Sequence, residues 1–141
     1  MHCSFKKDNK CDLMVPIKID KYGRTLVSAY VSVRPYAREI LIELKKHYEI
    51  IIFTASHKLY AKAIVKYLDP NSDIISYVLT REHCVLIEKM LIKDLRVIKN
   101  RDLKNMVIVD NCVSMFVNQL KNGIPVLPFE GEMGDTELKL L

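Results

Sequence analysis

The sequence predicts an α/β domain built on a mostly parallel sheet, with helices on both faces and a β-hairpin insertion. Three observations predict it: strand-like and helical segments alternate, two of the strand-like segments are apolar throughout, and a pair of alternating β-branched segments stands near the N-terminus. The length of 141 residues suits one domain, and no linker or repeat divides it. We therefore expect a single domain over residues 1–141.

The hairpin is predicted between residues 13 and 33. Leu13 to Asp20 (LMVPIKID) and Arg24 to Val33 alternate apolar and polar residues, and Tyr22-Gly23 between them is a turn signal. Pro16 favours an edge or an irregular start, because proline cannot donate a ladder hydrogen bond.

Helices and apolar strands follow the hairpin in alternation. Apolar residues at helical spacing predict helices, while short continuous apolar runs predict strands buried on both faces. In order, the expected elements are a helix from Pro35 to His47, a strand from Ile50 to Phe53, a helix from Lys58 to Leu68, short strands in IISYVL and CVLI, a strand from Met106 to Val109, a helix from Met115 to Leu120, a strand from Ile124 to Leu127, and a short terminal helix capped by Asp135.

Composition limits the classes of function. The net charge is +5, but the basic residues are scattered and form no nucleic-acid motif, which leaves at most a mild preference for anionic partners. No apolar run approaches the roughly 20 residues that a membrane span needs. The four cysteines form no CxxC pair, so we expect no zinc site and an intracellular, reducing compartment, with cytoplasm and nucleus not distinguished.

Ligands of parallel α/β sheets bind beyond the carboxyl ends of the strands. This rule selects Thr54-Ala55-Ser56 and Asp110-Asn111, which follow the two apolar strands. Thr54 can hold a phosphate or simply cap the next helix. Asp110-Asn111 offers the hard oxygen ligands that Mg²⁺ takes, or else a cap or turn.

Three further basic residues carry the same ambiguity between an anion site and a solvated surface. Lys93 lies in LIKDL, Arg81 lies in LTREHC, and Arg34 precedes Pro35. His57 and His83 have no convincing acid–base partner in the sequence, so we interpret both as surface or structural residues.

Six segments in sequence order carry a family resemblance: VSVRPYAREIL, EIIIFTAS, LTREHC, LIKDL, MVIVDN and IPVLPFEGEMGDTEL. Together they resemble the small C-terminal-domain phosphatases, a group that includes the Dullard-like and nuclear-LIM-interactor-like phosphatases of the haloacid dehalogenase superfamily. The resemblance extends from MHCSF to DTEL. It implies a haloacid-dehalogenase-like (Rossmannoid) sheet and a phosphoserine/phosphothreonine protein phosphatase that acts on phosphoprotein partners.

The resemblance also implies roles for particular residues. Thr54 matches the residue that hydrogen-bonds the transferring phosphoryl group, Lys93 the lysine that neutralises its charge, and Arg81 an arginine that faces the substrate phosphate. Asp110 and Asn111 match the residues that hold the Mg²⁺ cofactor. Four residues stand where small members build a hydrophobic pocket for a proline-containing peptide, with a plain core role as the alternative: Phe5, Ile17, Ile19 and Tyr60.

One departure from the family pattern concerns the nucleophile. In the family, a buried strand ending DLDETLVH precedes the equivalent of MHCSF, and its aspartates act as nucleophile and as general acid and base. No DxDx motif occurs in these 141 residues, and Asp8, Asp12 and Asp20 lie in polar or hairpin segments. We therefore expect the first central strand to be absent, the domain to be N-terminally truncated, and the chain as given to be inactive.

Two functions stay open at this point. One is a Mg²⁺-dependent protein phosphatase whose first strand is missing from the given sequence. The other is a non-catalytic, phosphatase-like binding module that belongs to a larger assembly.

Overall fold

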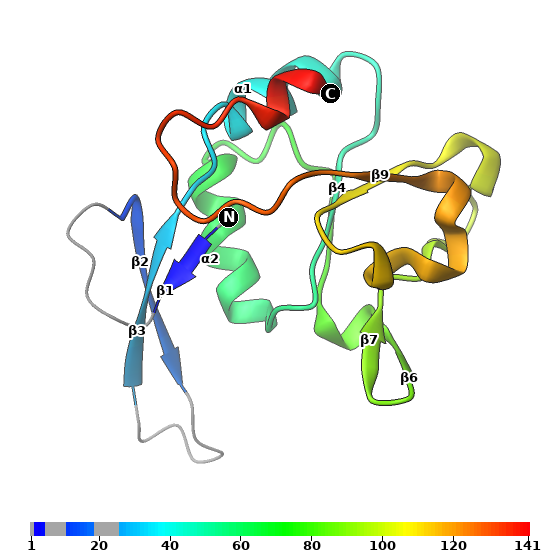
Figure 1. The fold of residues 1–141 in the computed structure, drawn as a ribbon, viewed down its shortest axis with the longest axis horizontal. Helices are drawn as coiled ribbons and strands as arrows, with labels where there is room; N and C mark the ends of the chain where they lie inside the picture. The colour runs from blue at the N-terminus through cyan, green and yellow to red at the C-terminus, as the bar shows by residue number, and fades with distance from the viewer. Residues whose placement is uncertain (1, 5–10, 19–25) are drawn as a thin grey trace.

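An antiparallel sheet of three short strands holds the N-terminal part of the chain (Figure 1). In it, β2 (Leu13–Lys18) and β3 (Leu26–Ser32) form the predicted hairpin, and β1 (His2–Ser4) pairs with the other edge of β3. The computed structural model describes residues 2–4, 11–18 and 26–141, so the expected turn at Tyr22-Gly23 lies outside the described residues.

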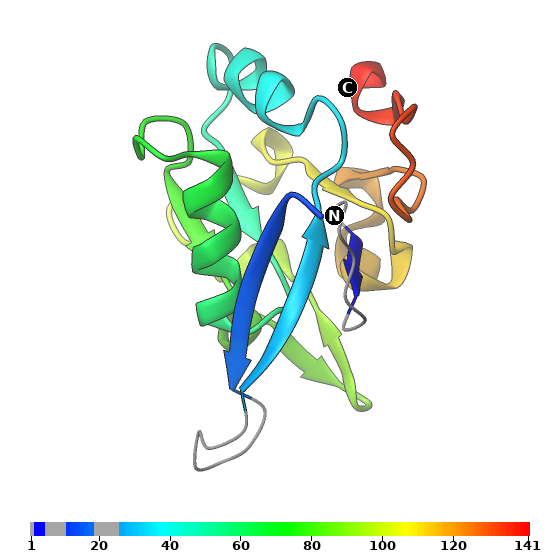
Figure 2. The same ribbon diagram turned by 90° about the vertical axis from the view of Figure 1, so that its left-hand side faces the viewer.

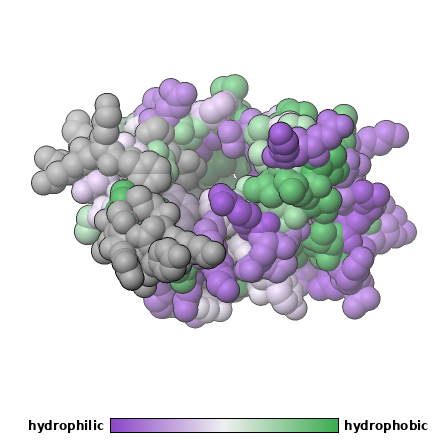
Figure 3. Space-filling model, turned by 90° about the horizontal axis from the view of Figure 1, so that it is seen from below, coloured by the Kyte–Doolittle hydropathy of each residue, from purple (hydrophilic) through white to green (hydrophobic). Residues whose placement is uncertain are grey.

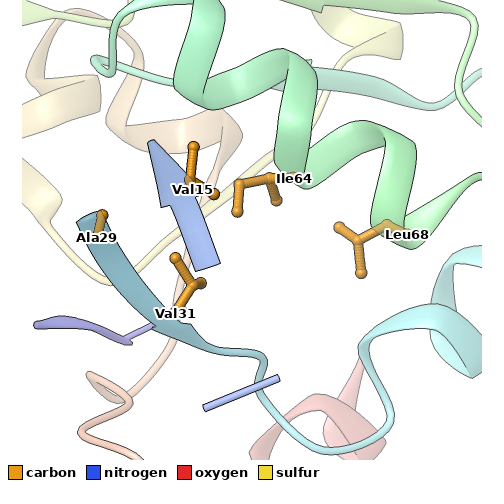
Figure 4. Close-up of a cluster of buried hydrophobic side chains, with 5 residues drawn as sticks. All are labelled: Val15, Ala29, Val31, Ile64 and Leu68. Carbon is orange, nitrogen blue, oxygen red and sulfur yellow. The ribbon is translucent and has the colours of Figure 1, made fainter. Parts of the chain in front are cut away.

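One face of this sheet packs against α2 (Lys58–Leu68), as Figures 2 and 4 show. Strand alternation places Val15 and Ala29 opposite each other on the face that the helix covers, and helical spacing presents Ile64 and Leu68 to them. These side chains and Val31 form the first hydrophobic core, where each is at most 6% exposed. The hairpin is therefore anchored by packing against a helix that starts more than 25 residues later.

The first two of the predicted helices are confirmed as α-helices. α1 (Ala37–Lys45) lies within the predicted range and follows Pro35, while α2 has the predicted bounds. The N-cap of α2 is His57, whose Nδ1 accepts a hydrogen bond from the backbone N–H of Leu59 at 3.3 Å. The structural interpretation of His57 is thus confirmed.

Asp69 ends α2 and organises the loop that follows. Its buried carboxylate accepts hydrogen bonds from the backbone N–H groups of Asp73, Ile74 and Ile75 at 2.9–3.0 Å. Burial by itself would raise the pKa of this carboxyl group, but the three N–H donors outweigh it and hold the pKa at about 2. The sequence predicted only that the helix stops here.

We expect Asp69→Asn to lower the free energy of unfolding at pH 6, and the difference from the wild type to shrink as the pH falls. Because the folded-state pKa lies below that of the unfolded chain, the stabilisation is present above about pH 4 and is lost as the pH falls towards about 2. Urea unfolding followed by circular dichroism at pH 6, 4 and 2 measures this. Asp102→Asn, at an exposed aspartate whose described carboxylate contacts are with Lys104, is the control at pH 6. If the free energies of unfolding of the wild type and Asp69→Asn differ by the same amount at pH 6 and pH 2, the lowered pKa of Asp69 does not contribute to stability.

Two parallel strand pairs form the part of the sheet that the sequence predicted as central. β4 (Ile51–Phe53) pairs with β5 (Tyr77–Leu79), and β8 (Ile108–Asp110) pairs with β9 (Gly123–Pro125). The parallel α/β class is therefore confirmed. Within the described chain, no strand joins the two pairs into one sheet.

The expectation that both apolar strands are covered on both faces needs correction. Ile108 is buried, but Val107 and Val109 on either side of it are 58% and 41% exposed, and residues 51–53 are only half-buried. The physical reason is that β8 has a packing layer on one face only and one strand neighbour, β9.

The connections contain a hairpin and several 3₁₀ helices. β6 (Val85–Ile87) pairs antiparallel with β7 (Met90–Ile92), a strand that the sequence analysis missed. The 3₁₀ segments are η1 (Arg81–His83), η2 (Leu95–Val97), η3 (Leu103–Asn105), η4 (Val113–Asn122) and η5 (Glu137–Leu140). Asp135 does not serve as the N-cap residue of η5, although its carboxylate accepts the N–H of Glu137.

η4 replaces the helix expected from Met115 to Leu120. Its backbone leaves helical geometry at Phe116 and Gln119, and both of these side chains are buried. Phe116 packs with Leu95 and Ile108 in the second hydrophobic core. The ring also lies close to Gly123, where an added Cβ would stand 1.9 Å from Phe116 Cε2, so only glycine fits at the start of β9.

Large apolar side chains are exposed around β6 to β9, and Figure 3 shows apolar residues gathered at this end of the molecule. They include Leu86, Ile87, Met90, Val107, Val109, Val113, Val117, Leu120 and Ile124. Among the described residues, no helix is long and apolar enough to cross a membrane.

The C-terminal segment is held by one buried arginine. Arg34 donates two hydrogen bonds to the Asp135 carboxylate, each 2.7 Å, and one to the carbonyl oxygen of Leu127 at 2.6 Å. Its guanidinium carbon also lies 5.6 Å from the centre of the Phe129 ring. The sequence left open whether Arg34 binds an anion or lies on the surface. The structure shows that it has a structural role and links the end of β3 to the C-terminal segment.

Candidate functional site

Asp110 stands at the carboxyl end of β8, where its side chain is held in place. It is 7% exposed, and its Oδ1 accepts a hydrogen bond from the backbone N–H of Cys112 at 2.9 Å. Its Oδ2 forms an ion pair with the Lys93 ammonium group. The structure therefore brings together two of the predicted site residues, which lie 17 positions apart.

Lys93 directly follows β7, and its backbone is fixed as well as its side chain. The N–H of Lys93 donates to the carbonyl oxygen of Met115 in η4 at 2.6 Å, and the side chain is 14% exposed. The solvent-facing alternative for this lysine is therefore wrong. A mostly buried ammonium group beside a carboxylate can be shared with a phosphoryl oxygen that enters the site.

The next residue, Asp94, binds the Lys93 segment to η4. Its carboxylate, 3% exposed, accepts hydrogen bonds from the side-chain amides of Asn118 and Gln119, both at 2.9 Å, and from Arg96. The Gln119 amide oxygen in turn accepts the N–H of Leu95 at 3.0 Å. The Arg96 guanidinium beside it and its other donors hold the pKa of Asp94 well below its usual value, despite burial.

The cluster of Asp94, Asn118 and Gln119 was not predicted from the sequence. One signal was available in VNQL, where two adjacent amides interrupt an apolar segment. Buried polar side chains normally carry hydrogen-bond partners, but the partner here is about 25 residues away and nothing local identifies it.

Thr54 follows β4 and lies at the start of the loop before α2. Its backbone N–H donates to the carbonyl oxygen of Leu79 at 2.9 Å, and its Oγ1 accepts the N–H of Ser56 at 3.1 Å. Because His57 is the N-cap of α2, the alternative that Thr54 caps this helix is wrong. The half-buried Thr54 hydroxyl still has a hydrogen to donate to a ligand.

Cys84 connects the Thr54 loop with Lys93. Its Sγ lies 3.9 Å from the carbonyl oxygen of Thr54, and the charges of Lys93 and Arg81 act on the thiol. Burial raises the pKa of Cys84, and the two positive charges oppose this rise. The Cys84 thiol therefore contacts the carbonyl oxygen of Thr54 and is subject to the charges of Lys93 and Arg81, the other two predicted phosphate-binding residues.

Arg81 begins η1 and is exposed. It is oriented by two bonds to the Thr54 loop: its N–H donates to the carbonyl oxygen of Ser56 at 3.1 Å, and its Nε donates to that of Ala55 at 2.8 Å. Its terminal guanidinium nitrogens have no acceptor in the described hydrogen bonds and can receive an anion. His83 accepts the N–H of Thr80 through Nδ1 at 3.0 Å, which confirms its structural interpretation.

Asn111 is exposed beside Asp110, so the pair can offer an amide oxygen and a carboxylate oxygen to one ion. In the described part of the chain, no group of three or more His, Cys, Asp or Glu side chains is arranged to hold a metal. The donor set fits Mg²⁺ in part, because this ion is commonly bound through one or two carboxylates, water and substrate phosphate. Lys93 occupies the Asp110 oxygen that such an ion would share.

The predicted peptide pocket is only partly described. Ile17 and Tyr60 are both partly buried and pack against the first hydrophobic core, as the core alternative predicted, whereas Phe5 and Ile19 lie outside the described residues. Burial, followed by the nearby Cys3 thiol, raises the pKa of the Tyr60 hydroxyl.

Comparisons with known proteins show the family of this chain. A family model described as NLI interacting factor-like phosphatase matches residues 1–141. The chain is 38% identical to the CTD small phosphatase-like protein 3 of Caenorhabditis elegans over 138 residues, which is 98% of this chain and 47% of that protein. It is 39% identical to the mitochondrial import inner membrane translocase subunit TIM50 of Candida glabrata over 108 residues, which is 77% of this chain and 22% of that protein.

Among solved structures, the fission yeast RNA polymerase II CTD phosphatase Fcp1 bound to beryllium fluoride has a similar fold. The TM-score is 0.73 at 24% identity, and the match covers 89% of this chain and 33% of that chain. This likeness confirms the haloacid-dehalogenase-like fold class. The chain spans only about half, or less, of the length of the curated relatives it matches, 47% in the worm protein and 22% in TIM50. By the full-length family match and by its similarity to these relatives, the chain belongs to the NLI interacting factor-like phosphatase family.

Proposed function

We propose that this chain supplies the phosphate- and metal-binding part of a Mg²⁺-dependent phosphoserine/phosphothreonine protein phosphatase that works through an aspartyl-phosphate. The observation that carries the proposal is the contact between Lys93 and Asp110. Thr54 and Asp110 stand at the carboxyl ends of the parallel strands β4 and β8, where α/β proteins bind their ligands, whereas Lys93 follows the second strand of the antiparallel β6–β7 hairpin.

Each residue has a distinct part in holding the phosphoryl group. The Thr54 hydroxyl donates to one phosphoryl oxygen, and the Lys93 ammonium group neutralises the charge on another. Asp110 and Asn111 would hold a Mg²⁺ ion, which when bound would supply positive charge to the phosphoryl group. When the phosphorylated substrate binds, the Lys93 ammonium group gives up its ion pair with Asp110 and pairs with the phosphoryl group instead.

The nucleophile comes from a strand outside these 141 residues, which contain no DxDx motif. The first aspartate of the motif attacks phosphorus, and the bond from phosphorus to the serine oxygen breaks. The second aspartate protonates that oxygen and then activates the water that releases phosphate from the aspartate. The unjoined strand pairs β4–β5 and β8–β9 support a position for this strand between β4 and β8.

The chain by itself therefore binds phosphorylated ligands and does not hydrolyse them. The test compares hydrolysis of p-nitrophenyl phosphate with Mg²⁺ by the 141-residue chain and by a version with an LDLDET-type strand added ahead of Met1. We expect activity only in the extended version. Asp110→Ala in the extended version is expected to lower the activity by about 100-fold or more, since it removes a charged group from the site.

Asp102→Ala is the matched control, because Asp102 is an exposed aspartate that caps a 3₁₀ helix and whose described carboxylate contacts are with Lys104 rather than with a candidate site residue. It is expected to leave the activity unchanged. Extended protein that is folded by circular dichroism and still inactive would refute the phosphatase proposal.

A second candidate is a non-catalytic subunit of a larger assembly. It is favoured by the similarity to a translocase subunit and by the exposed apolar side chains around β6 to β9. A folded but inactive extended chain is the result expected from this second candidate.

A further inference from the structure

A cavity of about 300 Å³ lies beside the candidate phosphate site. It is lined by the beginning of α2 and by η1, through His57, Lys58, Thr80, Arg81 and Glu82. Ser56 immediately precedes these α2 residues and accepts the N–H of Arg81 through its carbonyl oxygen at 3.1 Å. The cavity wall is thus continuous with the Thr54 loop.

The hydrogen-bond donors of this cavity are available to a ligand. Arg81 uses Nε for the Ala55 carbonyl oxygen, so its two terminal nitrogens keep their N–H groups free, and neither Arg81 nor Lys58 belongs to an ion pair among the described residues. His57 accepts the N–H of Leu59 through Nδ1, which leaves an N–H on Nε2.

One carboxylate opposes these donors. Glu82 also lines the cavity, where its Oε1 accepts the Thr80 hydroxyl hydrogen at 3.1 Å. Two permanent positive charges and an imidazole N–H therefore face a single negative charge, and the balance favours an anionic ligand.

We infer that this cavity binds a second anionic group of the substrate, a carboxylate or a phosphoryl group near the reacting phosphoserine or phosphothreonine. The inference rests on the proposed function, because it assumes that the first phosphate lies at Thr54. Lys58 is four residues from Thr54, and the backbone between them spans at most about 14 Å when extended. An extended peptide covers such a distance in about three to four residues, so the anion lies within that number of residues of the phosphoserine.

The test is fluorescence anisotropy with the 141-residue chain and labelled peptides. The peptides carry one phosphoserine flanked on both sides by glutamines, by glutamates, or by glutamines with one second phosphoserine. We expect the glutamate peptide to bind about three- to tenfold more tightly than the glutamine peptide. Tighter binding of the doubly phosphorylated peptide than of the glutamate peptide identifies phosphate as the preferred anion, and the reverse identifies carboxylate.

Variants that remove a positive or a negative charge from the cavity distinguish an electrostatic effect from a folding defect. The two kinds of variant are expected to shift the ratio of the affinities for the glutamate and glutamine peptides in opposite directions, which a folding defect would not do. Lys58→Met is expected to bring the ratio of the affinity for the glutamate peptide to the affinity for the glutamine peptide towards one. Glu82→Gln is expected to raise this ratio. Lys62→Met, one helical turn further along α2 and outside the cavity lining, is expected to leave the ratio unchanged.

Equal affinity for the glutamine and glutamate peptides would overturn the inference and leave the proposed phosphate site intact. Equal effects of Lys58→Met and Lys62→Met would also overturn it, because the preference would then come from the general positive charge of the chain. If neither peptide binds, the proposed function fails, and this inference fails with it.

Discussion

Replacing Asp94 by alanine is expected to lower the free energy of unfolding by about 3–5 kcal/mol. The carboxylate is 3% exposed and receives hydrogen bonds from Arg96, Asn118 and Gln119. Its removal leaves the Gln119 amide buried without an acceptor and opens a cavity between η2 and η4. Because the same cluster holds the Leu95 backbone, the segment that positions Lys93 loosens as well.

Urea unfolding followed by circular dichroism measures this loss of stability. Asp102→Ala is the matched control: both aspartates are the N-caps of short 3₁₀ helices, and each accepts the N–H two residues further on. The exposed Asp102 supplies the cap and a solvent-exposed ion pair with Lys104, so its replacement is expected to cost about 1 kcal/mol. Similar losses for the two variants would show that Asp94 is only a helix cap.

Replacing Arg34 by methionine is expected to lower the free energy of unfolding by about 3 kcal/mol. The arginine is 6% exposed, and its removal leaves the Asp135 carboxylate and the Leu127 carbonyl oxygen without their donor. Methionine keeps most of the apolar volume of the side chain, so the effect reports on the lost charge and hydrogen bonds. The C-terminal segment is expected to detach first, because Arg34 donates three hydrogen bonds to it from the residue position just after β3.

Hydrogen exchange of the segment after β9, together with urea unfolding, tests both parts of this prediction. The matched control is Arg101→Met, which removes another paired donation from arginine to a carboxylate, here to Glu49 at 2.9 and 3.1 Å. That pair is solvent-exposed, so little change in stability is expected. An equal effect of the two substitutions would mean that burial of the Arg34–Asp135 pair is not decisive.

The helices and strands of this protein follow from local patterns. The bounds of α2 were predicted from apolar spacing, and the antiparallel pairing of β2 with β3 was predicted from alternation around a turn. Such signals are local, because side-chain periodicity decides which face of an element is apolar within a few residues. The sequence predicted a plain helix where the structure has the kinked η4. The prediction failed because burial of Phe116 and Gln119 overrides the local helical preference.

The candidate site residues could also be named from the sequence, although their spatial relation could not. Position after an apolar strand selected Thr54 and Asp110, Lys93 and Arg81 were named as basic residues of open role, and family resemblance then implied that both bind phosphate. The pairing of Lys93 with Asp110 required the fold, since Lys93 follows β7, Asp110 ends β8, and the two residues are 17 positions apart.

Residue type and spacing by themselves therefore determined the α/β class, most of the elements and the choice of candidate residues. Only the tertiary structure decided which polar groups became buried partners: Arg34 with Asp135, 101 residues away, and Asp94 with Gln119, 25 residues away. The physical reason is that burying a charge is favourable only beside a partner of fitting geometry. The partner's position depends on the packing of whole elements and leaves no local signal in the chain.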